Sequence, residues 1–227
     1  MADLIVTIDG PAASGKSTAA WLLAEKLGAS FLDTGAMYRA VTYAAMQAGV
    51  DMSNEDQLLG VMEKSEFQFI ARGNIMMVRI GGVDVTEKLR DQQVTANARY
   101  VASAPKVREK LVRMQRRFAA AEERIVTEGR DQGTVAFADA DIKIFLTAEP
   151  SERARRRQAE LQTKGGGNSL EEIQIAIEQR DKSDRDRAVG PLRPADDAIV
   201  VDTTELNIEK VVDKLLGFVK EKCLKNG

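Results

Sequence analysis

The chain has 227 residues, of which 44% are hydrophobic and 30% are charged, and its formal net charge is −2. This composition is typical of a folded globular protein, and the balanced charge argues against a general attraction to nucleic acid. The single cysteine and the absence of histidine exclude an internal disulfide, a cysteine-rich zinc site and an imidazole base. No apolar run is long enough for a membrane span, and the early start of the first strand leaves no room for a basic leader. We therefore expect a cytoplasmic protein, and a monomer.

The first predicted elements are a strand, a loop and a helix. Residues 4–8 form a β-branched apolar run that ends at Asp9, as expected of a buried strand that leads into a loop. From Lys16 onward apolar residues recur at helical spacing, and Gly28 is a natural helix stop. The sequence therefore predicts a glycine-containing loop between a strand and a helix.

This loop carries the pattern G-x-x-x-x-G-K-[ST]. Its glycines let successive backbone N–H groups turn toward phosphate oxygens, and the next helix adds the positive end of its dipole. We expect Lys16 to reach the β and γ phosphates of ATP and the Ser17 hydroxyl to bind Mg²⁺. Asp9 and Asp33 are candidates to position water around that ion, and Asp9 could equally order the loop. The residues predicted to bind ATP here are Gly10, Pro11, Ala12, Ala13, Ser14, Gly15, Lys16, Ser17 and Thr18.

Later apolar runs alternate with helical patterns, which is typical of a parallel sheet covered by helices. Between residues 66 and 85 the period changes to two, with turn signals at Gly73-Asn74 and Gly81-Gly82, which predicts a small antiparallel insertion. The runs that join the first strand in a predicted five-stranded sheet are residues 30–32, 125–127, 142–147 and 198–201.

Three more helices are predicted toward the end of the chain. Residues 151–163 and 170–187 are charged helices joined by glycines at 165–167, and such a flexible joint suits a moving lid. Residues 207–222 place apolar side chains on one face and are expected to close the core. We therefore predict an α/β P-loop NTPase fold with a five-stranded parallel sheet flanked by helices, a small antiparallel insertion and a helical lid. The predicted division is a core of residues 1–34, 101–149 and 190–227, an insertion of residues 35–100, and a lid region with its following helix at residues 150–189.

A phosphate-binding loop alone does not name a function, because GTPases, motor ATPases and small-molecule kinases share it. A GTPase would carry an N-K-x-D motif, which this sequence lacks. A motor ATPase usually ends an apolar strand in adjacent acids, whereas residues 144–146 lead into Thr147. The sequence therefore favours a kinase that acts on a small acceptor.

Three further segments carry basic residues, at 33–39, 128–131 and 180–187. The first two follow predicted strands, and ligands gather at the carboxyl ends of strands in open sheets, so we expect them to meet beside the phosphate loop. The I-D-G-P opening, D-T-G-A-M-Y-R, E-G-R-D-x-G-T-V and the R-D-x-x-D-R-x-R segment ahead of Pro191 occur in this order. Together these motifs closely resemble bacterial cytidylate kinases over nearly the whole chain.

The resemblance implies transfer of the γ-phosphoryl group of ATP to CMP or dCMP, giving ADP and CDP or dCDP in pyrimidine nucleotide metabolism. It also implies that the insertion binds the monophosphate and that Thr34, Arg39, Arg130 and Arg187 hold the CMP phosphate. Guanidinium groups suit this task because they bind phosphate oxygens with two parallel hydrogen bonds. A phosphate acceptor needs little help from a general base, which agrees with the absence of histidine.

Other roles follow from the same resemblance. Asp131 and Arg108 would read cytosine, whose exocyclic amine donates and whose N3 and O2 accept hydrogen bonds. Arg180 and Asp184 would approach the sugar hydroxyls, and Arg157 in the lid would touch the transferring phosphoryl group. The expected catalytic residues are Lys16, Arg130, Arg157 and Arg187.

The sequence departs from the usual family pattern at two places. Ala138 stands where a proline is usual, and Arg99 stands where a serine often helps to read the base, so Arg99 could alter base contacts. In the lid, Arg153 and Arg156 accompany Arg157 on a helix whose arginines fold over ATP in the family.

Two alternatives remain open at this point. One is a P-loop kinase for another small acceptor, such as UMP, AMP or a shikimate-like acid. The other is an ATP-switched module that docks nucleic acid through its arginine-rich helices. The balanced charge and the lack of an aromatic stacking platform disfavour the second, so we expect neither nucleic acid nor a membrane as a partner.

Overall fold

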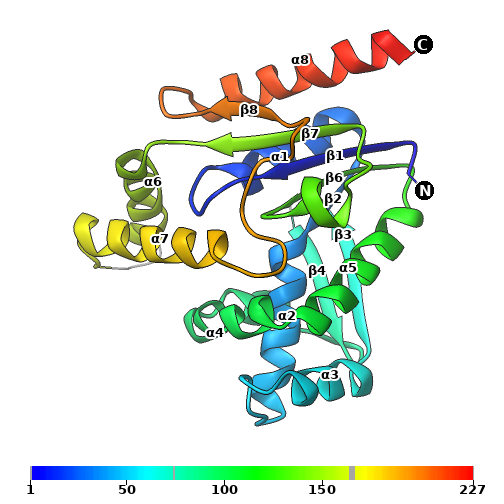
Figure 1. Ribbon diagram of the computed structural model, residues 1–227, viewed down its shortest axis with the longest axis vertical. Helices are drawn as coiled ribbons and strands as arrows, with labels where there is room; N and C mark the ends of the chain where they lie inside the picture. The colour runs from blue at the N-terminus through cyan, green and yellow to red at the C-terminus, as the bar shows by residue number, and fades with distance from the viewer. Residues whose placement is uncertain (1, 74, 164–166, 227) are drawn as a thin grey trace.

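The computed structural model describes residues 2–73, 75–163 and 167–226. A five-stranded sheet forms its centre, with the strand order β2-β6-β1-β7-β8 and parallel pairing throughout (Figure 1). All five predicted core strands are confirmed. They are β1 (Leu4–Asp9), β2 (Ser30–Asp33), β6 (Arg124–Gly129), β7 (Ile142–Thr147) and β8 (Ile199–Asp202).

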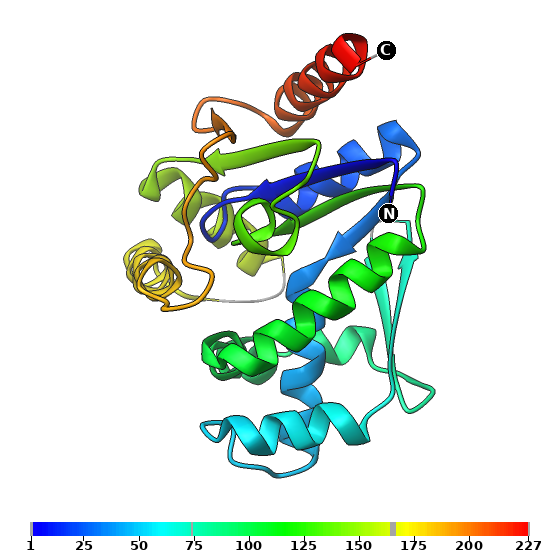
Figure 2. The ribbon, with the colours of Figure 1, turned by 45° about the vertical axis from the view of Figure 1, so that its right-hand side comes forward.

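Helices cover both faces of this sheet. Val6 and Ile8 of β1 pack toward α1 (Lys16–Leu27) and α8 (Ile208–Asn226), whereas Ile5 faces the cluster that holds α2 (Thr34–Gln47) and α5 (Pro105–Ala120). This alternation follows from the period of two along a strand, and each fully buried Ile or Val side chain contributes about 1.5–3 kcal/mol. Figure 2 shows α8 above the sheet and α5 below it. No helix in the described ranges combines the length and apolarity needed to cross a bilayer.

The predicted antiparallel insertion is confirmed as a three-stranded sheet with the order β3-β4-β5. Gly81 and Gly82 form the second turn with positive φ angles of 56° and 81°. Gly73 enters the first turn, and Asn74 lies outside the described residues. The elements of this region are α3 (Glu55–Lys64), β3 (Phe67–Arg72), β4 (Ile75–Ile80), β5 (Val83–Asp84), the 3₁₀ turn η1 (Thr86–Arg90) and α4 (Gln92–Ser103).

The insertion shares its apolar interior with the central sheet. Met76 and Val78 of β4 belong to the same buried cluster as Leu32 of β2 and Ile125 of β6. α2 supplies much of that cluster and leads from the sheet into the insertion. Burial therefore fixes the insertion against the sheet rather than leaving it attached by its two connections alone.

The two predicted lid helices are α6 (Pro150–Gln162) and α7 (Leu170–Arg185), which pack against each other at one side of the molecule (Figure 1). α7 begins with a capping box, in which the Ser169 hydroxyl accepts from the Glu172 N–H and the Glu172 side chain accepts from the Ser169 N–H. Of the predicted glycine joint, Gly165 and Gly166 lie outside the described residues. α7 ends two residues earlier than the predicted Arg187.

Candidate functional site

Three loops that the sequence analysis selected leave the sheet at one edge. Asp9 at the end of β1 lies in register with Gly129 of β6, and Asp33 at the end of β2 lies beside Glu128. The phosphate loop follows Asp9, α2 follows Asp33, and Arg130 follows Gly129. The parallel register therefore brings the predicted donor and acceptor segments to one mouth of the sheet, as expected.

The phosphate loop has a backbone that few residues could adopt. A Cβ on Gly10 would collide with the carbonyl oxygen of Leu146 in β7. Gly15 has a φ of 83° immediately before α1, and Ala13 has a φ of 57°, the one positive φ of a non-glycine residue in the described ranges. An alanine in this conformation costs about 1–2 kcal/mol, so the surroundings must hold the loop in place.

Lys16 lies over this loop, where it is 5% exposed and its Nζ donates to the Pro11 carbonyl oxygen at 3.0 Å. Burial and the positive charge of Arg130 lower the pKa of Lys16 to about 7, although the carboxylate of Glu128 opposes the change. A buried ammonium that lacks a full counter-charge is poised to receive an anion. Thr18 lies exposed in the first turn of α1.

Glu128 is a site residue that the sequence analysis missed. It is 6% exposed at the end of β6, and its Oε1 accepts a hydrogen bond from the Ser17 hydroxyl at 2.9 Å. A hydroxyl and a carboxylate side by side at the phosphate loop match the oxygen ligands that Mg²⁺ prefers. Its position could have indicated this role in the sequence, because Glu128 is an acidic residue near the end of β6, the strand that pairs with β1.

The structure gives Asp9 and Asp33 other tasks. Asp9 accepts hydrogen bonds from the backbone N–H groups of Gln132 and Gly133 at 2.9 and 2.8 Å, and burial raises its pKa to about 7. It therefore orders the loop after β6, whereas the sequence analysis had offered it as a residue that orders the phosphate loop. Asp33 caps α2 by accepting from the Ala36 N–H at 2.8 Å, and it forms an ion pair with Arg39 at 3.2 Å.

Arg130, Asp184 and Arg187 form an ionic cluster that joins the loop after β6 to α7. The Nε of Arg130 donates to Asp184 at 2.7 Å, and the Nη2 of Arg187 lies 3.4 Å from the same carboxylate. Although burial opposes it, the charges of the two arginines lower the pKa of Asp184. Thr34 lies next to this cluster and donates its hydroxyl to the Glu128 carbonyl oxygen at 2.7 Å.

Several positively charged side chains lie close together at the carboxyl ends of the strands. Desolvation and the positive charge of Arg130 lower the pKa of Arg180 to about 10, and Arg39 and Arg157 act in the same direction. Arg180 and Arg130 both depress the pKa of Lys16. Such a concentration of like charges is unfavourable in the free protein and becomes favourable when polyanions bind.

The two residues predicted to read a base are paired with each other. Arg108 and Asp131 form a buried ion pair, with side chains 3% and 6% exposed, and the Arg108 guanidinium lies 5.6 Å from the centre of the Tyr38 ring. Gly190, in the segment after α7, covers this pair with a φ of 61°. A Cβ at Gly190 would collide with both Asp131 and Arg108.

This packing predicts a specific cost for a methyl group at Gly190. The Gly190→Ala change is expected to lower the free energy of unfolding by about 2–5 kcal/mol, because left-handed strain of about 1–2 kcal/mol adds to overpacking of about 1–3 kcal/mol. Gly28→Ala is the matched control, since Gly28 has a φ of 59° and no neighbour within 4 Å of its Cβ position. Denaturant unfolding should show the larger loss for Gly190→Ala. Equal losses would contradict the close contact with the ion pair.

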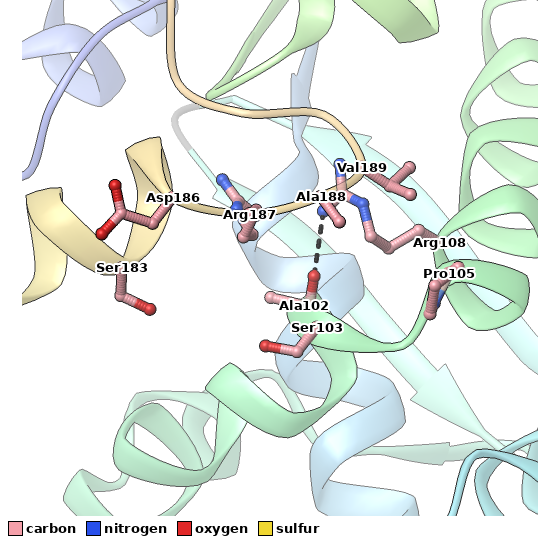
Figure 3. Close-up of a pocket in the computed structure, with 9 residues that line it drawn as sticks. All are labelled: Ala102, Ser103, Pro105, Arg108, Ser183, Asp186, Arg187, Ala188 and Val189. Carbon is pink, nitrogen blue, oxygen red and sulfur yellow. Dashed lines mark hydrogen bonds between the residues drawn. The ribbon is translucent and has the colours of Figure 1, made fainter.

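A cavity of about 320 Å³ opens beside this pair, between the end of α4 and the segment that follows α7 (Figure 3). Arg108 and Arg187 line it, and Arg108 donates to the Ala102 carbonyl oxygen at 3.4 Å. Within the described residues, the buried Nε of Arg108 and Nη2 of Arg187 have no hydrogen-bond partner. Buried guanidinium nitrogens without a hydrogen-bond acceptor indicate a binding site for a ligand that is rich in acceptors.

The three lid arginines differ in their surroundings. Arg157 forms an exposed ion pair with Glu160 at 2.9 Å, and Arg156 donates to the Thr203 hydroxyl and carbonyl oxygens at 3.0 and 2.6 Å. Arg153 is buried in the molecule, so it is not free to fold over a ligand as the sequence analysis expected.

The two departures from the family pattern lie outside the cavity wall. Arg99 is exposed and stacks over Tyr100, with its guanidinium 5.0 Å from the ring centre. Ala138 is exposed in the loop that follows the π turn η2 (Gln132–Ala136). Neither residue lines the cavity that Arg108 and Arg187 share.

Known proteins resemble this chain over nearly its whole length. The sequence model of the family described as Cytidylate kinase matches residues 6–221. The chain is 46% identical to the cytidylate kinase of Aliivibrio salmonicida, across 96% of this chain and 97% of that one. It is also 46% identical to the cytidylate kinase of Vibrio cholerae, across 97% of both chains. A solved structure of an uncharacterized protein from Eubacterium ventriosum shares the fold, with a TM-score of 0.51, 12% identity and coverage of 96% of this chain and 98% of that one.

Proposed function

The chain belongs to the cytidylate kinase family, and we propose that it transfers the γ-phosphoryl group of ATP to CMP or dCMP, giving ADP and CDP or dCDP. One observation supports this most strongly. The phosphate loop with Lys16 and the ionic cluster of Arg130, Asp184 and Arg187 lie at the same edge of the sheet. This arrangement can hold two phosphate-bearing molecules next to each other.

On the donor side, the N–H groups of residues 10–15 and the start of α1 would surround the phosphates of ATP. The Lys16 ammonium would neutralise negative charge on the oxygens of the β and γ phosphates. The Ser17 hydroxyl and the Glu128 carboxylate fit a Mg²⁺ ion by their oxygen chemistry and their 2.9 Å separation. Bound there, Mg²⁺ would supply positive charge to the phosphates of the donor.

On the acceptor side, Thr34, Arg39, Arg130 and Arg187 are assigned to the CMP phosphate. Binding would replace part of the ion pairing of Arg39 with Asp33 and of Arg130 with Asp184, so these carboxylates keep the guanidinium groups oriented in the free protein. The sugar hydroxyls are assigned to Arg180 and Asp184, which come from the same helix.

The base site would use the Arg108–Asp131 pair. The Asp131 carboxylate can accept from the exocyclic amine of cytosine, and the unpartnered Nε of Arg108 can donate to an acceptor on the ring. Uracil would place an oxygen against the carboxylate, and such an unmatched pair costs about 1–3 kcal/mol. On these electrostatic grounds the proposed base site would favour cytosine over uracil.

In this reaction the protein has only to position the two substrates and to stabilise negative charge. A phosphate oxygen of CMP is already a nucleophile near neutral pH, so no residue has to remove a proton. Lys16, Arg130, Arg187 and Arg157 would stabilise the charge of the transferring group. The division into a core, an insertion and a lid region is retained as the proposed domain organisation.

The shifted pKa of Lys16 predicts proton uptake when the donor binds. At pH 8 a lysine with a pKa of about 7 is about 90% neutral, and a bound polyanion restores its charge. Calorimetric titration with MgATP in two buffers of different ionisation enthalpy should therefore show uptake of nearly one proton at pH 8 and much less at pH 6. Identical heats in the two buffers at pH 8 would contradict the assignment.

The function itself is tested by measuring ADP release with ATP, Mg²⁺ and a panel of acceptors. CMP and dCMP are expected to stimulate ADP release more than UMP, AMP or shikimate. A greater response to any of these three would redirect the proposal to that acceptor. Tight, strongly salt-dependent binding of RNA without transfer to any free nucleotide would favour the nucleic-acid alternative.

A further inference from the structure

A second ion pair lies buried between the two lid helices. Arg153 of α6 and Asp181 of α7 are in contact, with side chains 7% and 2% exposed. The proposed function gives neither residue a contact with a substrate. Since a buried ion pair is on balance a weak source of stability, a pair in this position calls for a role other than holding two helices together.

This pair forms hydrogen bonds with both the N–H and the carbonyl group of Ala12 in the phosphate loop. The Ala12 N–H donates to the Oδ1 of Asp181 at 3.0 Å, and the Nη1 of Arg153 donates to the Ala12 carbonyl oxygen at 3.0 Å. Arg153 is itself oriented by a hydrogen bond from its Nε to the carbonyl oxygen of Ala148, the residue after β7, at 3.0 Å. We call this arrangement of Arg153, Asp181 and Ala12 the backbone clamp.

Apolar contacts support the clamp. Ala12 belongs to a small buried cluster with Ala154 of α6 and with Ile173 and Ile177 of α7, and Ala13 packs against its edge. The loop is therefore attached to the lid helices by two hydrogen bonds and by packing, besides its covalent link to β1. Because Ala13 is held at a φ of 57°, the peptide groups on either side of Ala12 must be fixed for the loop to keep its shape.

The clamp also links the two halves of the site. α7 carries Asp181 against the donor loop and, one turn later, Asp184 against Arg130 on the acceptor side. A displacement of α7 would therefore change the loop and the acceptor cluster together. A rigid connection of this kind is what in-line transfer between two anions requires.

We propose that Arg153 and Asp181 are positioning residues of the donor site, which set the geometry of the phosphate loop by holding the peptide groups of Ala12. This inference rests on the donor half of the proposed function, that residues 10–17 bind the phosphates of ATP. It assigns to the lid helices a permanent contact with the loop in the unliganded protein. Stability and donor binding can be separated by experiment, because the two charges can be removed together.

The decisive variant is Arg153→Met combined with Asp181→Leu. Removal of both charges restores or exceeds wild-type stability in many buried pairs, because no charge is left unpaired. The peptide groups of Ala12 nevertheless lose both partners. We expect thermal unfolding near that of the wild type, an ATP dissociation constant raised by about tenfold or more, and a KM for CMP within about twofold of wild type, as for lost supporting contacts of a ligand site.

Two further variants complete the test. Asp181→Asn keeps the size of the side chain but turns an amide toward Arg153, and it should raise the ATP dissociation constant by at least about threefold. Asp141→Asn is the matched control, because the Oδ2 of Asp141 accepts from the Ile5 N–H at 2.8 Å at the opposite end of β1. It should leave ATP binding unchanged.

Calorimetric titration with ATP in the absence of any acceptor gives the decision. A double variant that is stable and binds ATP as the wild type does would overturn the inference, since the pair would then be structural only. If the double variant does not fold, wild-type affinity in Asp181→Asn would overturn it equally. A wild-type protein that binds ATP but does not phosphorylate CMP would contradict the proposed acceptor. The effect of Arg153 and Asp181 on ATP binding could still be measured in that case.

Discussion

Replacing Lys16 by alanine is expected to lower kcat for transfer from ATP to CMP by about 10³-fold, comparable to the loss of a transition-state donor in other enzymes. The ammonium is buried against the phosphate loop, and no other lysine in the described residues approaches that loop in a hydrogen bond or ion pair. Thermal stability should not fall along with activity. Burial of the Lys16 ammonium is unfavourable to the folded state, so its removal takes away a cost of folding. Initial rates and thermal unfolding of the same preparation check both statements.

Lys26→Ala provides the control for this experiment. Lys26 lies on the same helix α1, but its side chain is 48% exposed and pairs with Asp213 at 3.5 Å. An exposed pair of this kind contributes about 0–1 kcal/mol, so rate and stability should both stay close to wild type. Comparable kcat values for Lys16→Ala and Lys26→Ala would remove Lys16 from the mechanism.

Asp131→Asn is expected to reduce the preference for CMP over UMP by about 10²-fold, because an amide can turn its N–H₂ toward the oxygen that uracil presents. The change also leaves Arg108 beside a weaker partner, so some loss of stability will accompany it. The ratio of kcat/KM for the two acceptors is the quantity to measure. Because both acceptors meet the same variant, a change in the amount of folded enzyme cancels from that ratio.

The control here is Asp197→Asn, which removes a carboxylate paired with Lys143 at 2.9 Å outside the site. Its ratio for CMP over UMP should equal that of the wild type. A wild-type enzyme with equal kcat/KM for the two acceptors would contradict the base-reading role of Asp131 before any variant is made.

The sequence predicted the central sheet well because each strand is a β-branched apolar run with a turn signal behind it. Residues 142–147 were placed to the residue, and Gly28 ends α1 in the left-handed conformation that the pattern indicated. The antiparallel insertion was equally visible in its period of two. Local pattern was sufficient for these elements, since each depends on neighbours along the chain.

Contacts between distant segments could not be predicted in the same way. Glu128 beside Ser17, Gly190 over Asp131 and Asp181 against Ala12 join positions that are 111, 59 and 169 residues apart. No periodic pattern predicts such pairs, because a single acidic residue or glycine can serve many local roles, such as a turn or a helix cap. The burial of Arg153 could not be predicted either, because its place on a charged helix gave no sign of it.

The meeting of two nucleotides at this site is tested most directly by a crystal structure of the protein with CMP and a non-hydrolysable ATP analogue. We expect the CMP phosphate between Arg39, Arg130 and Arg187, with one of its oxygens facing the terminal phosphate that Lys16 holds. A CMP phosphate bound elsewhere on the molecule, with these three arginines still paired only to Asp33 and Asp184, would contradict it.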